Sequence, residues 1–347
     1  MQAGGSAVDG AIAANAALGF LEPTGCGIGG DLFAIVWEPN STALHGLNAS
    51  GRSASGLDLP TLKQALGDRS DIPLFGPHSV SVPGAVDGWF ALHGKFGRLP
   101  MATLLAPAID CAEHGDPRAP VIARTMALNF AAFESALPLI GEFDNAREPY
   151  FSSGPPAVGT IVKNPDLARS YRRVAEGGRA AFYEGAIAET IDAYLRRVGC
   201  PLRREDFAAH RSEWVEPATV DYRGVTLCEL PPNTQGFAAL QMANILKNVE
   251  LNQWPRGSAE TLHFITEAKR LAYEDVARIY ADPDFAAIPA DGRLSEAYGR
   301  QRFERIDPHK ANPDFGPGDP TLEGPGDTTY LTVADKDGMM VSLIQSN

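Results

Sequence analysis

The sequence contains few of the residues that mark several classes of protein. Its 347 residues include only four cysteines, Cys26, Cys111, Cys200 and Cys228, which are widely separated and form no CxxC pair. This spacing predicts neither a zinc site nor a disulfide framework, and we expect free, buried thiols. No apolar run approaches the roughly 20 residues that a membrane helix needs.

Positive charge is also scarce. Lys and Arg number 30 against 43 Asp and Glu, which gives a net charge of -13. Nucleic acids and anionic membranes are bound by clustered Lys and Arg, whereas the densest basic spots here are short pairs such as Arg172-Arg173. We therefore expect neither a nucleic acid nor a membrane as a partner.

The sequence shows no signal peptide, but it opens directly at a helix start and stops in or just after a strand. These abrupt ends predict a fragment of a longer protein. In a fragment, a missing signal peptide says little about the cellular compartment in which the protein works. Localisation stays unknown at this stage, with a cytoplasmic location favoured.

Hydrophobic periodicity and turn residues predict a mixture of helices and strands, which is an α+β protein. Ser6 and Asp9 resemble a capping box ahead of a helix rich in small residues. The expected helices are 7–20, a helix ending near 97, 101–114, 119–136, 164–176, 184–198, 237–246 and 263–280. The expected strands are two hairpins, 31–38 with 42–48 and 329–334 with 339–344, and a strand pair within 220–230.

Two sequence patterns resemble ligand-binding motifs, but we interpret neither of them as a binding site. Residues 25–30 fit GxGxxG, but they follow a helix and open a strand, which reverses the order of a dinucleotide fingerprint and leaves a close backbone approach as the interpretation. In the helix 263–280, His263 and Glu267 have i,i+4 spacing. No second cluster containing His completes a metal site, so we expect no metal. We interpret His263, Glu267, Glu274 and Asp275 as charged residues that face solvent.

The junction before the last hairpin offers a nucleophile. A segment rich in Pro and Gly, 313–326, predicts an exposed connector that enters a buried strand at Asp327-Thr328. If the bond between these two residues were cut, Thr328 would have its hydroxyl as nucleophile and a free α-amine, with a pKa of about 7.7 to 8.0, as general base. Taken alone, the pattern also fits a threonine that merely begins a strand.

A polar loop leaves the first hairpin at residues 48–53. It contains Asn48, Ser50 and Arg52. A guanidinium here either binds a substrate carboxylate or is solvated or ion-paired at the surface, and the residues alone leave both open.

Several short strings occur together in one order. They are GGSAVD (4–9), GIGGDLF (27–33), VPGAV (82–86), PPNTQG (231–236), EAKRLAY (267–273), DPDF (282–285), DTT (327–329) and DKDG (335–338). With these strings the chain resembles the gamma-glutamyltranspeptidase family (gamma-glutamyltransferase, glutathione hydrolase) over essentially its whole length.

The resemblance implies an N-terminal-nucleophile hydrolase with two stacked sheets between helical layers, an αββα sandwich. It implies a proenzyme that cuts itself into a large and a small subunit, which then form a heterodimer. On this basis residues 1–327 are the large-subunit region, and residues 328–347 are the first hairpin of the small subunit within a single αββα domain that is truncated at both ends.

By the same resemblance Thr328 is the nucleophile, Asp327 supplies the carbonyl cut in maturation, and Ser346 is a supporting hydroxyl. The expected substrate is a γ-glutamyl amide such as glutathione, with water or an amino acid as acceptor and no cofactor. Arg52, Ser50 and Asn48 are the expected substrate-binding residues.

Two departures from the family pattern leave alternatives open. Family members specific for γ-glutamyl groups have an Arg-Glu pair where this chain has Ser50 and Gly51, so the pattern is closer to the branch that includes cephalosporin and glutaryl acylases. The chain also stops at Asn347, before the family's paired oxyanion glycines. A second reading is therefore an inert fragment or precursor with only binding competence.

Overall fold

The computed structural model describes residues 1–286, 290–312 and 328–346. The chain packs as two compact units. The first comprises Met1–Ala43, Leu47–Glu213 and Gly326–Asn347, and the second comprises Leu44–Gly46 and Trp214–Pro325. The predicted division into 1–327 and 328–347 concerns cleavage of the chain and stays a prediction.

A five-stranded sheet joins the two ends of the sequence. Its order is β5-β2-β1-β9-β8, so that β9 lies between β1 and β8 and is antiparallel to both. The strands are β1 (Leu32–Glu38), β2 (Ala43–Ala49), β5 (Glu213–Val215), β8 (Thr328–Ala334) and β9 (Met340–Ser346). Both predicted hairpins are therefore confirmed, and among the described residues β8 is the last strand at one side of the sheet.

The turn of the last hairpin is built as its sequence predicts. Gly338 has a φ of 88°, which an L side chain rarely adopts. The Asp335 carboxylate accepts hydrogen bonds from the N–H groups of Asp337 at 2.9 Å and Met339 at 3.1 Å, and from the N–H of Ala7 at 3.0 Å. The same turn thus caps the helix that begins at Ala7.

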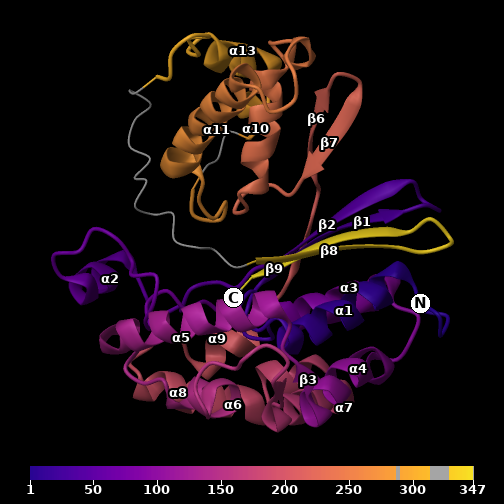
Figure 1. Ribbon diagram of the computed structural model, residues 1–347, viewed down its shortest axis with the longest axis vertical. Coiled ribbons are helices and arrows are strands. Elements are labelled where there is room, and N and C mark those ends of the chain that lie inside the picture. Colours follow the sequence, from indigo (N-terminus) through magenta and orange to yellow (C-terminus); the bar gives the residue numbers. More distant parts are fainter. Residues whose placement is uncertain (287–289, 313–327, 347) are drawn as a thin grey trace. The chain divides into compact units, whose positions relative to one another are not determined.

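Helix α1 (Ala7–Leu21) supports the sheet. Ser6 and Asp9 form the predicted capping box, and the small side chains of α1 let it pack closely. Figure 1 shows α1 and α3 (Ala85–Phe96) next to the sheet, with α4 (Met101–His114) and α7 (Pro165–Tyr183) in a further layer. The main core of the first unit lies between these helices and the sheet.

The remaining elements of the first unit are short or peripheral. They are α2 (Leu59–Leu66), β3 (Asp116–Pro117), α5 (Pro120–Ile140), α6 (Asp144–Phe151), β4 (Ile161–Val162), α8 (Ala186–Arg197) and α9 (Arg204–Ala209). The predicted helices are confirmed. Within α7 the non-helical Gly178, at φ 65° and ψ -162°, separates two helical segments, and the first of them ends close to the predicted end at residue 176. Helices α2, α6 and α9 were not anticipated because they bury few side chains.

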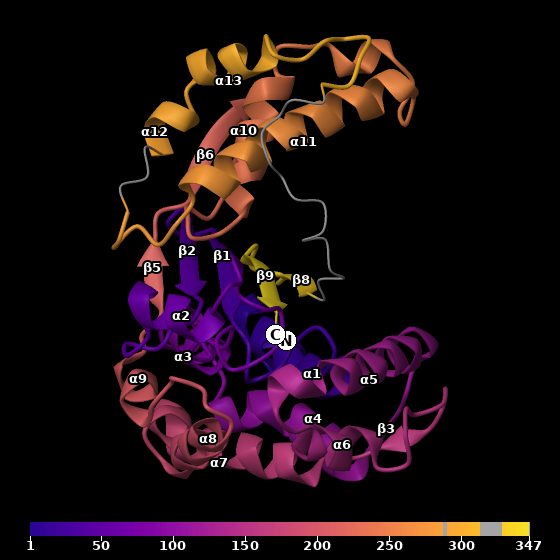
Figure 2. The same ribbon diagram turned by 90° about the vertical axis from the view of Figure 1, so that its left-hand side faces the viewer.

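The second unit is mostly helical. Helix α10 (Gly236–Leu246) lies between the β6–β7 ribbon (Ala218–Tyr222 and Val225–Glu229) and α11 (Ala259–Ile279) (Figure 2). The short elements η1 (Leu251–Gln253), α12 (Ala290–Arg293) and α13 (Glu296–Phe303) complete it. Its core gathers apolar side chains of α10 and α11.

The charges of α11 correct one expectation. Glu267, Glu274 and Asp275 are buried rather than solvent-facing, with exposed fractions of 1%, 9% and 5%. Glu274 accepts a hydrogen bond from Arg302 at 2.8 Å, and Asp275 pairs with Arg293 at 2.9 Å. Arginines from α12 and α13 thus neutralise Glu274 and Asp275, which periodicity within α11 cannot reveal, whereas Glu267 pairs with Arg270 of α11 itself at 3.0 Å. Within the described residues no group of His, Cys, Asp and Glu could hold a metal ion.

The α+β class is confirmed. The described part of the chain contains one five-stranded sheet and two two-stranded sheets, so the second large sheet of an αββα sandwich is not among the described residues. None of the described helices is long and apolar enough to cross a membrane. The four cysteines are free, as expected, but only Cys26 and Cys200 are buried, and Cys111 and Cys228 are partly exposed.

Candidate active site

Thr328 and Ser346 lie opposite each other at the open end of the last hairpin. They are register partners in β8 and β9, and Thr328 Oγ1 donates a hydrogen bond to Ser346 Oγ at 3.2 Å. Thr328 is exposed, so its hydroxyl is accessible on the edge strand. The structure thus brings together the two hydroxyls that the sequence singled out. Asp327, Asn347 and the connector 313–326 lie outside the described residues.

Thr329, the next residue along β8, is held by an acidic residue that sequence reasoning missed. Its Oγ1 donates to Glu22 Oε2 at 3.0 Å, and Thr24 donates to the other oxygen of the same carboxylate. A Cβ added at Gly25 would lie 2.5 Å from Glu22 Oε2, so a larger residue there would displace this carboxylate from its present place. Glu22, which precedes the glycine turn, thus holds the second residue of the candidate nucleophile strand, and no sequence signal linked Glu22 to Thr329.

Cys26 lies in the same turn but is not a reactive thiol. It is 1% exposed, and its Sγ donates to the backbone oxygen of Glu22 at 3.6 Å. Burial raises the pKa of the Cys26 thiol to about 11, against the opposing hydrogen bond with Thr329. The thiolate is therefore a minor species at neutral pH, which leaves the hydroxyl of Thr328 as the nucleophile candidate here.

The loop with the predicted substrate-binding residues has its own internal structure. Asn48 Oδ1 accepts hydrogen bonds from the Ser50 N–H at 3.0 Å and the Ser50 hydroxyl at 2.7 Å. The side chains of Asn48 and Ser50 thus bind each other and shape a turn. Arg52, the third predicted residue, forms an exposed ion pair with Glu213 at 3.4 Å.

Gly51 lies against the backbone of another segment. A Cβ built at Gly51 would lie 1.5 Å from the carbonyl oxygen of Val82, and one built at Gly84 would lie 1.8 Å from that of Ala49. Two backbones therefore meet where only glycine fits. The family's glutamate at this position would require a different backbone path, so the departure at Gly51 changes the shape of the loop as well as its charge.

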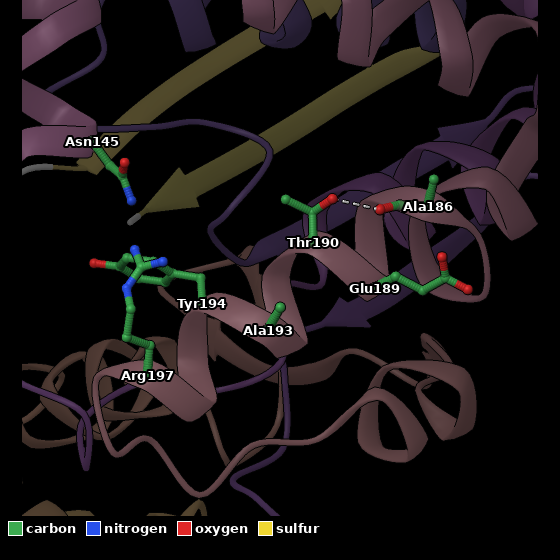
Figure 3. Close-up of a pocket in the computed structure, with 7 residues that line it drawn as sticks. All are labelled: Asn145, Ala186, Glu189, Thr190, Ala193, Tyr194 and Arg197. Carbon is green, nitrogen blue, oxygen red and sulfur yellow. Dashed lines mark hydrogen bonds between the residues drawn. The ribbon is translucent and has the colours of Figure 1, made fainter.

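A pocket on the helical side of the first unit lies elsewhere. Its lining residues are Asn145, Ala186, Glu189, Thr190, Ala193, Tyr194 and Arg197, mostly from α8 (Figure 3). None of the predicted site residues is among them. The Arg197 guanidinium lies over the Tyr194 ring at 5.1 Å.

Comparison with known proteins decides the family. The profile for Gamma-glutamyltranspeptidase matches residues 1–347. The chain belongs to the gamma-glutamyltranspeptidase family. Its members are hydrolases and transferases, and its solved structures are N-terminal-nucleophile hydrolases.

Three similar proteins illustrate the range of similarity. The Glutathione hydrolase-like YwrD proenzyme of Bacillus subtilis (strain 168) is 36% identical over 99% of this chain and 62% of its own length. The crystal structure of cephalosporin acylase from Bacillus halodurans matches with a TM-score of 0.87 and 38% identity, over 99% of this chain and 62% of that one. Helicobacter pylori gamma-glutamyltranspeptidase matches with a TM-score of 0.80 and 26% identity, over 93% of each chain. The chain thus spans 62% of the length of the first two proteins.

Proposed function

We propose that this protein is a self-processing amide hydrolase and acyltransferase whose nucleophile is the hydroxyl of Thr328. The observation that carries the proposal is the exposed position of Thr328 at the start of β8, with its Oγ1 3.2 Å from the Ser346 hydroxyl. Membership in the gamma-glutamyltranspeptidase family, and a relative named as a proenzyme, support it.

In maturation, Thr328 Oγ1 attacks the carbonyl carbon of Asp327. The peptide C–N bond breaks as an ester forms, and the Thr328 nitrogen receives the proton that the hydroxyl loses. Water then hydrolyses the ester, which leaves a C-terminal carboxylate on Asp327 and restores the Thr328 hydroxyl. The products are a large subunit ending at Asp327 and a small subunit beginning at Thr328, which stay together as a heterodimer.

In turnover, the same hydroxyl attacks the carbonyl of an amide substrate. The α-amine of Thr328 accepts the hydroxyl proton and passes it to the leaving amine, and the Ser346 hydroxyl, 3.2 Å away, then donates its own proton in a hydrogen bond to Thr328 Oγ1. The resulting acyl-enzyme is opened by water in hydrolysis or by the amine of an amino acid in transfer. Each cycle returns Thr328 to its starting form.

The substrate that we propose is a γ-glutamyl amide of the glutathione type, with Arg52 as the group that binds its α-carboxylate. Arg52 already pairs with a carboxylate, that of Glu213, and the pair is exposed. An exposed pair contributes little stability, about 0 to 1 kcal/mol, so a substrate carboxylate could displace Glu213 at small cost. Asn48 and Ser50 would fix the turn that carries Arg52.

A second candidate is an acylase that cleaves glutaryl or cephalosporin-type amides. The backbone contact of Gly51 with Val82 favours it, because this loop has no room for the glutamate of the Arg-Glu pair. The similarity to a cephalosporin acylase also supports it. The two candidates share the nucleophile and differ only in the acyl group.

The test is to incubate the protein expressed from its complete gene and sequence the fragments. We expect a new N-terminus at Thr328, no cleavage or turnover of γ-glutamyl p-nitroanilide in Thr328→Ala, and partial retention of both in Thr328→Ser. The matched control is Thr332→Ala, an exposed threonine on the same strand. Cleavage of Thr328→Ala at the wild-type rate would contradict the proposal. Assay of residues 1–347 alone tests the inert-fragment reading, which Thr328-dependent turnover would exclude.

A further inference from the structure

Asp31 immediately precedes β1 and holds the end of the neighbouring strand β9. Its backbone N–H donates to the carbonyl oxygen of Ser346 at 3.2 Å, and its Oδ1 accepts the N–H of Ser346 at 2.9 Å. One residue therefore binds both backbone groups of Ser346. The last residue of a strand tends to fray unless its backbone is held, so these two bonds fix Ser346 in place.

The register places Asp31, Ser346 and Thr328 in one row across three strands. Phe33 pairs with Ile344 in the β1–β9 ladder, and two residues further along each strand Asp31 reaches Ser346. In the β9–β8 ladder Ser346 pairs with Thr328. Ser346 thus lies between the carboxylate of Asp31 and the hydroxyl of Thr328, and it is bonded to both.

A carboxylate at this place has an energetic cost. Burial raises the pKa of the Asp31 carboxyl above its ordinary range, although hydrogen bonds from the N–H groups of Ser346 and of Asp31 itself oppose the rise. Asp31 is partly buried, and its carboxylate bears this solvation cost while its Oδ1 accepts the N–H of Ser346. Its direct contact is the residue that supports the proposed nucleophile.

We propose that Asp31 is a positioning residue for the reaction of Thr328, acting through Ser346. By holding both backbone groups of Ser346, Asp31 sets the place from which the Ser346 hydroxyl receives the hydrogen bond of Thr328 Oγ1. The inference rests on the proposed function. It adds Asp31, the residue that follows the glycine turn, to a site built from the last hairpin.

The experiment compares Asp31→Ala with Asp31→Asn in the protein expressed from its complete gene. Asn keeps an Oδ1 acceptor for the Ser346 N–H, whereas Ala removes it. We expect Asp31→Ala to slow self-cleavage and to lower kcat for γ-glutamyl p-nitroanilide by about 10- to 100-fold, because small displacements of reacting groups have effects of this size. KM should stay within about twofold, and Asp31→Asn should retain kcat within about threefold.

A double variant of Asp31 and Ser346 distinguishes a positioning role of Asp31 from a general loss of structure. In a Ser346→Ala background, Asp31→Ala should cause no further loss beyond about twofold, because its effect is already removed. Asp337→Asn, a carboxylate in the turn of the same hairpin, is the control and should behave as wild type. If Asp31→Ala does not fold, Asp31→Glu displaces the acceptor by one methylene and should lower kcat likewise.

The role of Asp31 would be overturned if Asp31→Ala kept the wild-type kcat, or if the losses of kcat in Asp31→Ala and Ser346→Ala multiplied in the double variant. Neither result would contradict the role of Thr328 as the nucleophile. Turnover that persists in Thr328→Ala would instead overturn the proposed function itself. The two failures therefore give different results.

Discussion

Asn15 Nδ2 donates a hydrogen bond to Gln345 Oε1 at 2.7 Å, although the two residues are 330 positions apart. The Oδ1 of Asn15 accepts from the indole N–H of Trp89 at 2.7 Å, and Gln345 donates in turn to the carbonyl oxygen of Gly27. Asn15 and Gln345 are fully buried. This chain of bonds ties α1, α3 and the glycine turn to the residue that precedes Ser346.

Gln345→Ala should destabilise the protein by about 2 kcal/mol, because it leaves the buried Nδ2 of Asn15 without its acceptor and removes one of the two hydrogen bonds that the Gly27 carbonyl accepts. Urea unfolding measures the change. Gln64→Ala, at an exposed position of α2, is the matched control and should have little effect. Equal unfolding midpoints for the two variants would contradict this role of the network.

Gly51→Ala should be strongly destabilising, by about 3 kcal/mol or more, because its Cβ would lie 1.5 Å from the Val82 oxygen and a backbone must move. Gly56→Ala in the same loop region is the control, since a Cβ there meets no atom within 4 Å. Thermal unfolding of both variants checks the prediction. A stable Gly51→Ala protein would show that the contact is easily relaxed.

Arg52→Ala should raise KM for γ-glutamyl and glutaryl p-nitroanilides by about 10- to 100-fold and leave the butyryl compound unchanged, because only the first two carry a carboxylate. Arg69→Ala, which removes another exposed, ion-paired arginine, is the control. A preference of wild type for γ-glutamyl over glutaryl amides would favour the transpeptidase reading, and the reverse preference the acylase. An equal effect on all three substrates would remove Arg52 from carboxylate binding.

Stability of the first unit should fall as the pH drops below about 6.5, the ordinary pKa of histidine. Burial lowers the pKa of His210, against the attraction of Asp87, and nearby arginines lower it further. Below pH 6.5 the unfolded chain therefore binds a proton at His210 that the folded chain does not bind. The contribution of His210 to stability is fully present above the pKa of the unfolded state. It is lost as the pH falls from that value to the pKa of the folded state. The slope for one proton is at most about 1.4 kcal/mol per pH unit.

The test is to measure unfolding midpoints between pH 7 and pH 5. His210→Gln should flatten the pH dependence, whereas His114→Gln, at a side chain that is 70% exposed, should leave it as in wild type. The Asp87 carboxyl contributes to stability in a separate pH range, below that of His210. Burial opposes the shift, but hydrogen bonds from Ser212 and Arg179 lower the pKa of Asp87, so its contribution is lost only as the pH falls well into the acid range. Identical slopes for wild type and His210→Gln would refute the assignment.

Much of the secondary structure could be predicted from the sequence. The spacing of apolar residues and the capping box predict α1, and the turn Asp335–Gly338 between two apolar runs predicts the hairpin of β8 and β9. These signals are local, because helix periods, caps and turns depend on residues a few positions apart. For the same reason the sequence could place Thr328 at the start of a strand and Ser346 at the end of the next.

The support of the candidate site could not be predicted in this way. Nothing local connects Glu22 with Thr329, Asp31 with Ser346, or Asn15 with Gln345, since each pair is more than 300 residues apart. The same limit explains the error on Glu274 and Asp275 of α11, which are neutralised by arginines from α12 and α13.

The sequence by itself determined most of the longer helices and strands, and through the ordered family strings it singled out the hydroxyl of Thr328. Only the tertiary structure decided which residues hold that hydroxyl, because β9 near the C-terminus pairs with β1 near the N-terminus. The glycine turn of residues 25–30, which alone predicted only a close backbone approach, lies between Glu22 and Asp31 and so brings two carboxylates to the open end of the hairpin. Long-range pairing fixes such positions because the free energy of a contact depends on distance in space and not on separation in the sequence.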